Sequence, residues 1–116
     1  MKSLKAIRGA IFVDEDTPEE IKRRTLQLME KIYTANSMGD EEVVAVVFSV
    51  TKGIRSFNPA TAFRESGHDL PLMCLQEADF EGAPLMVVRV MILANSEKSV
   101  NVYENGALSL KNGGRK

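Results

Sequence analysis

The stretch that most constrains the fold of this chain is a nine-residue apolar run, Leu85 to Leu93, which contains a single charged residue, Arg89. A short run rich in Val, Ile and Leu is typical of a strand that is buried on both faces. A guanidinium cannot be neutralised by deprotonation, so inside such a strand it must be paired or must face a polar cavity. We therefore predict that Arg89 points into a pocket and binds an anionic ligand. The alternative is a structural ion pair at a sheet edge or at a subunit contact.

Strand and helix signals follow one another along the rest of the chain. The clearest helix begins after Thr17, where Glu20 completes a capping box, and it is expected to end near Asn36. A second, short helix is expected from Pro59, with Asn58 as its cap. Strands are expected at residues 4–13, 43–50, 70–76 and 85–93, and again within 100–110, where Asn105-Gly106 predicts a hairpin turn.

The first strand carries two further signals, Arg8 and Gly9. A glycine inside a strand marks a bulge or a close approach of another backbone. Arg8 is a second arginine inside an apolar strand, and two such arginines in one small domain favour a shared anionic site. The long helix that joins this strand to the next predicts a right-handed crossover between parallel strands.

Length and charge narrow the class of protein. A chain of 116 residues is expected to form one domain. A formal net charge of -1 gives no general attraction to nucleic acid, and no apolar run is long enough to span a membrane. A single cysteine excludes an internal disulfide, and the lone His68, expected to be an exposed loop residue, makes a transition-metal site improbable. These features predict a reduced, cytoplasmic protein without a metal site.

Several side chains could share one site, namely Arg8, Arg64, Glu77, Arg89 and Tyr103, with Cys74 close to Glu77 in the sequence. Several cations with one carboxylate suit a small polar dianion that also carries a hydroxyl group. No nucleophile with a neighbouring base is evident, and we interpret Cys74 as a small buried residue in preference to a nucleophile. Tyr103 fits a ligand contact and an amphipathic packing position equally well.

Four segments together, IRGAIFVDEDTPEEI, FNPATAFRESG, CLQE and VVRVM, resemble the monofunctional bacterial chorismate mutases of the homotrimeric type. The order and spacing agree from about residue 5 to residue 95, which is most of the chain. The resemblance implies an α+β fold, with a mixed, mainly antiparallel sheet and helices packed outside it. Three chains would form a pseudo-barrel with an active site at each interface. One domain would span residues 1–116, with a flexible tail from about residue 112.

The resemblance also implies an activity, the rearrangement of chorismate to prephenate on the route to phenylalanine and tyrosine. The reaction needs no metal, no organic cofactor and no covalent intermediate. Arg89 would contact the ether oxygen and a carboxylate, Arg8 would hold a carboxylate, and Glu77 would accept a hydrogen bond from the ring hydroxyl. The other substrate-binding residues would be Phe57, Ala60, Arg64, Met73, Cys74, Tyr103 and, in a closing tail, Leu110. The alternative is a trimeric protein that binds a small anion without catalysis.

Overall fold

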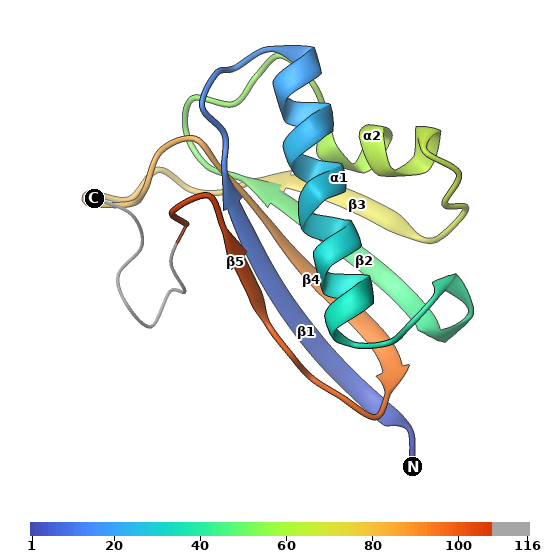
Figure 1. The fold of residues 1–116 in the computed structure, drawn as a ribbon. Helices are drawn as coiled ribbons and strands as arrows, with labels where there is room; N and C mark the ends of the chain where they lie inside the picture. Colours follow the sequence, from blue (N-terminus) through green and yellow to red (C-terminus); the bar gives the residue numbers. More distant parts are fainter. Residues whose placement is uncertain (108–116) are drawn as a thin grey trace.

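The structure is a computed structural model, and it describes residues 1–107 of the chain. Five strands form one mixed sheet, and both α-helices pack on the same face of that sheet (Figure 1). The elements in chain order are β1 (Ser3–Phe12), α1 (Pro18–Ala35), the 3-10 turn η1 (Asp40–Glu42), β2 (Val43–Val50), α2 (Pro59–Glu65), β3 (Leu72–Gln76), β4 (Val87–Ser96) and β5 (Val102–Glu104). The strand order across the sheet is β3-β2-β4-β1-β5.

The strand that contains Arg89, β4, lies at the centre of the sheet. It runs antiparallel to both of its neighbours, β1 and β2, and these are the two longest pairings. The outer pairs, β2 with β3 and β1 with β5, are parallel. The expected α+β class with a mixed, mainly antiparallel sheet is therefore confirmed.

The crossover predicted from the first helix is only partly correct. β1 and β2 do point the same way, as a strand-helix-strand unit requires, but β4 lies between them. An intervening helix sets the relative direction of two strands without making them neighbours. The second unit, β2-α2-β3, is the one in which the two parallel strands pair directly.

Alternate residues of the three central strands face the helices and form the core. On α1 the buried positions are those at helical spacing that the sequence predicts: Ile21, Thr25, Leu28, Met29 and Ile32. They pack against fully buried strand residues, which include Ile7, Ile11, Val46, Phe48, Val88 and Ile92. Burial of this apolar surface is the main force that holds the helices on the sheet.

The predicted helix caps are present, with one difference. Thr17 Oγ1 accepts a hydrogen bond from the backbone N–H of Glu20 at 3.2 Å, and Asn58 Oδ1 accepts one from the N–H of Ala60 at 2.8 Å. The Glu20 carboxylate does not return to Thr17 but accepts the N–H of Asp14 at 3.1 Å. The Thr17 N–H instead donates to the Glu15 carbonyl, so the reciprocal half of the capping box is replaced by a local turn.

Gly9 marks a close approach and not a bulge. The β1–β4 pairing runs without a register shift through this residue. A Cβ at Gly9 would lie 2.7 Å from Ile32 Cδ1 and 2.9 Å from the carbonyl oxygen of Val102. The missing side chain therefore lets both α1 and β5 pack closely against β1.

The turn after β5 is also as predicted. Asn105 has φ 51° and Gly106 has φ 82°, the left-handed conformation that Asn-Gly favours. The second arm of the expected hairpin, Leu110 and the expected flexible tail from about residue 112 lie outside the described residues.

His68 is not the exposed loop residue that the sequence predicts, because its side chain is partly buried. Its ring stacks on Phe63 with centroids 3.9 Å apart, and its Nδ1 lies 2.8 Å from Asp40 Oδ1. The Tyr33 hydroxyl donates to the same carboxylate oxygen at 2.8 Å. Burial, together with the adjacent Asp40 carboxylate, raises the pKa of Tyr33 far above its ordinary value. This cluster ties the end of α2 to α1 and to η1.

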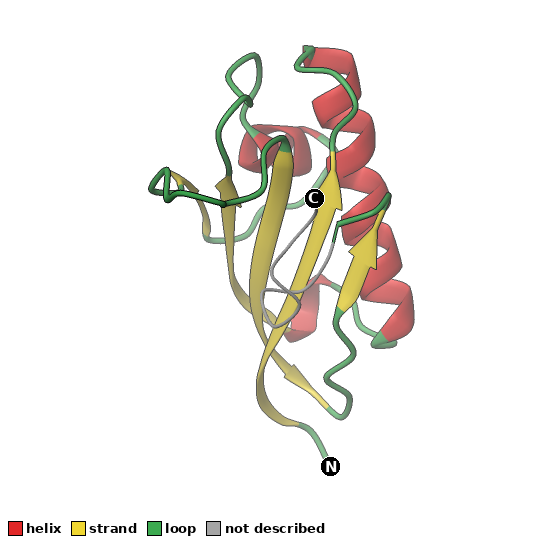
Figure 2. Cartoon of the chain, turned by 90° about the vertical axis from the view of Figure 1, so that its left-hand side faces the viewer, coloured by secondary structure: helices red, strands yellow, loops and turns green. Residues whose placement is uncertain are grey.

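The opposite face of the sheet carries no helix in residues 1–107. Figure 2 shows the strands toward the viewer, with the helices behind and to the right. Side chains on this face remain open to solvent although several are apolar, including Leu4, Met73, Leu75 and Met91. The prediction that β4 is buried on both faces is therefore wrong for one chain, because both helices cover the same side.

Candidate active site

A pocket of about 350 Å³ lies on the uncovered face of the sheet. It opens over β1, β4 and β2, and reaches the end of β3 on one side and β5 on the other. Four of the predicted site residues line it: Arg8, Glu77, Arg89 and Tyr103. The remaining lining residues are Gly9, Ala10, Val47, Ser49, Leu75, Val90 and Met91.

Arg89 projects from the central strand into this pocket. Its partners in register are Ala10 on β1 and Ser49 on β2, and both are small. Small neighbours leave room for the guanidinium to lie over the sheet, and 13% of the side chain remains exposed. The prediction that this arginine faces a cavity agrees with the pocket geometry, although a carboxylate partner is present as well.

That partner is Glu77, whose position follows from the end of β3. Its backbone N–H donates to the Val50 carbonyl at 2.9 Å, which extends the β2–β3 pairing by one residue. Strand alternation then places its side chain on the same face as Leu75, toward the pocket. The Ser49 hydroxyl donates to Glu77 Oε2 at 2.6 Å.

The contact between Arg89 and Glu77 is an ion pair without a well-aligned hydrogen bond. Arg89 Nε lies 2.9 Å from Glu77 Oε2. The N–H does not point at that oxygen, so the buried Nε makes no hydrogen bond within the described residues. A buried donor of a charged group without a hydrogen-bond acceptor is unfavourable. The arginine is therefore held beside the carboxylate while its hydrogen-bonding capacity remains largely unused.

Arg8 supplies the second positive charge at the pocket. It pairs in register with Met91 on β4 and is exposed. No ion pair involves its guanidinium within residues 1–107. Its backbone N–H donates to Asn101 Oδ1 at 2.9 Å, which fixes the strand at this point. With two arginines and one carboxylate, the charges that line the pocket sum to a net positive value suited to an anion.

Tyr103 reaches the pocket from β5, a strand of three residues. It pairs in register with Ala10 and packs against a small cluster that contains Val87 and Ala107. So short a strand needs further support, and polar contacts supply it on the other face of the sheet. Gln27 Nε2 donates to Glu104 Oε1 at 3.4 Å, and Lys31 Nζ lies 4.0 Å from the same oxygen.

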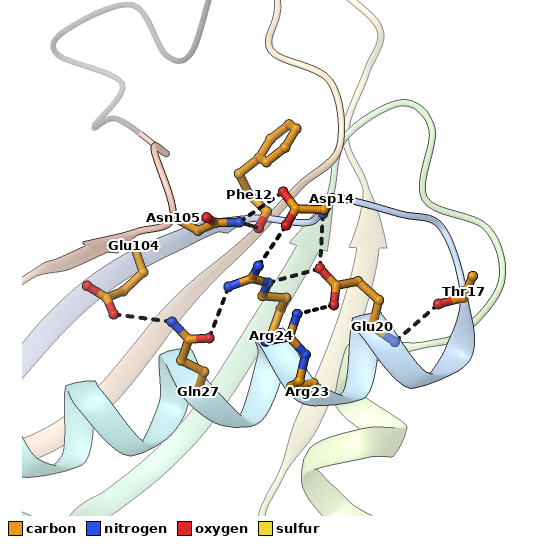
Figure 3. Close-up of polar contacts among 9 residues, drawn as sticks. All are labelled: Phe12, Asp14, Thr17, Glu20, Arg23, Arg24, Gln27, Glu104 and Asn105. Carbon is orange, nitrogen blue, oxygen red and sulfur yellow. Dashed lines mark hydrogen bonds and ion pairs between the residues drawn. The ribbon is translucent and has the colours of Figure 1, made fainter.

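The contact between Gln27 and Glu104 belongs to a network that joins α1 to the ends of β1 and β5 (Figure 3). Arg24 lies at its centre and donates to Glu20 Oε2 at 2.9 Å, Asp14 Oδ2 at 2.8 Å and Gln27 Oε1 at 3.2 Å. Asn105 Nδ2 donates to the Phe12 carbonyl at 2.8 Å. The network thus ties Glu104, the residue after Tyr103, to α1 and ties Asn105 to the end of β1.

The charges of the network favour the ionised form of the Glu20 carboxyl group. Burial of Glu20 opposes ionisation, but hydrogen bonds from Arg24 and Arg23 outweigh it and lower the pKa of Glu20. The same carboxylate, with that of Asp14, raises the pKa of Arg24 against the effect of burial. The charges that support β5 are therefore mutually stabilised.

Five predicted residues do not line this pocket in a single chain. Cys74 pairs in register with Phe48 and packs toward the helix-covered core, so its prediction as a lining residue is not met within one chain. Burial raises the pKa of its thiol, which agrees with a small packing residue. Met73 shares the face of Glu77 but lies beyond the pocket, while Phe57, Ala60 and Arg64 lie in or next to α2.

The residue that the sequence analysis missed is Ser49. It is the only polar side chain in the strand VVAVVFSV, and alternation puts it on one face with Val47. That signal was available, but its proximity to Arg89 and Glu77 depends on the pairing of β2 with both β4 and β3. No spacing within the sequence carries that information.

Comparison with known proteins identifies the family of this chain. The model of the family "Chorismate mutase type I" matches residues 4–113. This chain belongs to the chorismate mutase type I family.

Individual chorismate mutases are similar over most of their length. Chorismate mutase AroH of Thermus thermophilus is 42% identical over 96 residues, which cover 81% of this chain and 79% of that protein. Chorismate mutase AroH of Bacillus subtilis (strain 168) is 40% identical over 96 residues, covering 81% and 76%. A solved structure of a chorismate mutase from Clostridium thermocellum superposes with a TM-score of 0.83 at 34% identity, covering 88% of this chain and 96% of that one. The resemblance to the chorismate mutases that the sequence motifs predict is confirmed, and so is the α+β fold that it implies for one chain.

Two observations concern what the described residues do not contain. No helix in residues 1–107 is long and apolar enough to cross a membrane. Within the same residues, no group of three or more His, Cys, Asp or Glu side chains could hold a metal ion. The expectation that this chorismate mutase needs no cofactor remains a prediction.

Proposed function

We propose that this chain converts chorismate to prephenate in the pocket over β1, β4 and β2, with Arg89 as the principal catalytic residue. The observation that carries the proposal is the position of Arg89, in the centre of the sheet, in a pocket, with a buried Nε that makes no hydrogen bond in the described residues. Chorismate carries two carboxylates, a hydroxyl group and an ether oxygen, which matches a pocket with two arginines, one carboxylate and a tyrosine.

Charge development explains how this arrangement would accelerate the reaction. As the carbon–oxygen bond of chorismate breaks, negative charge grows on the ether oxygen. A guanidinium already fixed beside that oxygen stabilises the transition state more than it stabilises the bound substrate. The pocket also restricts the substrate to the folded, diaxial conformer, which removes part of the entropic barrier. Neither effect requires a nucleophile or a base.

The other pocket residues would bind and orient the substrate. Arg8 would hold a carboxylate, since its guanidinium has no ion pair in residues 1–107. Tyr103, on β5 at the side of the pocket opposite Glu77, would donate a hydrogen bond from its hydroxyl to a carboxylate. Glu77 would accept a hydrogen bond from the ring hydroxyl and so set which way the ring faces. Its ion pair with Arg89 keeps the two groups next to each other.

We further propose that three copies of the chain assemble, and that each site is completed by a neighbouring chain. Met73, Leu75 and Met91 are 55%, 51% and 43% exposed on the uncovered face of the sheet. Contiguous exposed apolar side chains of this kind indicate a contact surface. In such a trimer Phe57, Ala60, Arg64, Met73 and Cys74 would approach the pocket of another chain. Leu110, which lies outside the described residues, would belong to a segment that closes over the site.

A mixing experiment tests the shared site. Arg89→Ala and Arg64→Ala proteins, each of very low activity alone, are combined under conditions that allow subunit exchange. If each site takes Arg89 from one chain and Arg64 from the next, about a quarter of the sites in a random closed trimer regain both arginines. Activity should rise accordingly. No recovery after demonstrated exchange would place both arginines of a site in one chain, and high activity of Arg64→Ala alone would remove Arg64 from the site.

The activity itself is tested on purified protein by following chorismate consumption and prephenate formation, with light scattering to measure the size of the assembly. Stoichiometric prephenate formation is expected from a particle of three chains. The second candidate function, a trimeric protein that binds a small anion without catalysis, would use the same arginines. It would show saturable binding of chorismate and no turnover. The single domain over residues 1–116 and the cytoplasmic location expected from the sequence also remain predictions.

A further inference from the structure

We propose that Ser49 is a positioning residue for the reaction, which acts by fixing the carboxylate of Glu77. This inference rests on the proposed function, because it concerns how Glu77 is presented to the substrate. Ser49 lies on β2, and its Oγ donates to Glu77 Oε2 at 2.6 Å. Both residues line the pocket.

The length of this hydrogen bond indicates a charge-assisted contact. Hydroxyl donors approach ionised carboxylates at about 2.5–2.7 Å, closer than they approach neutral acceptors, and such bonds are roughly twice as strong. Ser49 has a single hydroxyl proton, and the carboxylate is the acceptor that it reaches. The bond therefore runs from the Ser49 hydroxyl to the Glu77 carboxylate.

A second observation shows why Glu77 needs this partner. Arg89 Nε lies 2.9 Å from the same oxygen, but its N–H makes no hydrogen bond there. Attraction between two charges holds them near each other without fixing the rotation of the carboxylate. Within the described residues, Ser49 supplies the one directional contact to the Glu77 side chain. Without it the carboxylate could rotate about the last side-chain torsion, which is soft at such sp³–sp² bonds.

The two oxygens of the Glu77 carboxylate differ in their contacts. Oε2 receives both the Ser49 hydroxyl and the Arg89 charge. Oε1 has no hydrogen-bond donor among residues 1–107, and Glu77 lines the pocket. Oε1 is then the oxygen presented to the substrate hydroxyl. Ser49 thus selects the orientation in which a free acceptor faces the ligand.

The position of Ser49 in the sheet makes this role specific to the fold. Its partners in register are Arg89 on β4 and Leu75 on β3, the residue two before Glu77. A serine on β2 therefore bridges the two strands that supply the ion pair. The same side chain on any other strand of the sheet would not lie between these two groups.

The test is a double-mutant cycle on kcat/KM with Ser49→Ala and Glu77→Ala. Loss of one hydrogen bond to a charged group should lower kcat/KM of Ser49→Ala about tenfold. In the Glu77→Ala background, Ser49→Ala should have no further effect, because the hydroxyl then has no carboxylate to orient. Ser3→Ala, at an exposed serine at the start of β1, is the matched control and should leave kcat/KM unchanged.

The outcomes separate this inference from its alternatives. Equal loss of kcat/KM on Ser49→Ala in both backgrounds would overturn it, because Ser49 would then contact the substrate directly or act through packing. Wild-type kcat/KM in Ser49→Ala would overturn it as well. In either case the turnover of chorismate by the wild-type protein stands as a separate result. Unfolding midpoints are measured for all four proteins, and Ser49→Ala should leave the midpoint of each background nearly unchanged, which shows that its effect on kcat/KM does not arise from stability.

Discussion

Replacing Arg89 by methionine should nearly abolish turnover while leaving the fold intact. Methionine matches the apolar stem of arginine but carries no charge. The guanidinium is largely buried, with 13% of the side chain exposed, and its partner Glu77 is 30% exposed. Because Glu77 keeps its hydrogen bond from Ser49 and its contact with solvent, the variant does not leave a deeply buried unpaired charge.

The expected size of the effect follows from the charge that develops on the ether oxygen. At a hydrogen-bonding distance of about 3 Å and an effective dielectric constant of about 20, two unit charges attract by about 5 kcal/mol. If roughly half a charge develops on the ether oxygen, the arginine stabilises the transition state by about 3 kcal/mol, which corresponds to about a hundredfold in rate. This agrees with the effect of removing one preorganised donor from an active site. Arg89→Lys should recover little of this loss, because a lysine lacks the planar fork of donors.

The assay is the rate of prephenate formation across a range of chorismate concentrations, with the free energy of unfolding measured in parallel. Arg55→Met is the matched control, since Arg55 is exposed and does not line the pocket. We expect a fall in kcat, a free energy of unfolding that is unchanged or slightly higher, and a control with wild-type activity. Wild-type kcat/KM in Arg89→Met would refute the assignment. A large loss of stability with proportional loss of activity would show instead that the ion pair is structural.

Two further predictions concern the support of the site. Gly9→Ala should destabilise the protein by about 1–3 kcal/mol, because the new Cβ would lie 2.9 Å from the carbonyl oxygen of Val102, a backbone atom that cannot move aside freely. Thermal unfolding measures this loss of stability. An unchanged unfolding midpoint would show that β5 shifts without penalty. The second prediction concerns stability at low pH. Folding lowers the pKa of Glu20, so the ionised carboxylate contributes to the free energy of unfolding above the ordinary pKa of 4.5, and this contribution is lost as the pH falls below that value. Denaturant unfolding between pH 6 and pH 3 should therefore show a weaker pH dependence in Glu20→Gln than in the wild type, and parallel curves would contradict the assignment.

Much of the fold could be predicted because it depends on neighbours in the sequence. The caps at Thr17 and Asn58, the buried stripe of α1 and the Asn105-Gly106 turn all follow from local rules that operate over a few residues. A buried arginine in an apolar strand led to the prediction of an anionic site, and the structure places that arginine in a pocket.

Long-range pairing could not be predicted in the same way. The sequence favoured a direct crossover from β1 to a neighbouring parallel β2, but β4 lies between the two strands. A strand takes its place in a sheet according to the hydrophobic face that it completes, and not according to its order in the chain. His68 illustrates the same limit, since its stacking on Phe63 and its contact with Asp40 join residues from separate elements.

The sequence by itself therefore determined the elements, the family and the identity of the charged groups, since local propensity and motif spacing encode them. Only the tertiary structure decided that Ser49, Glu77 and Arg89 meet, because each comes from a different part of the chain and the sheet register alone brings them within hydrogen-bonding distance. It also decided that, among residues 1–107, one face of the sheet carries no helix, because both helices pack on the other.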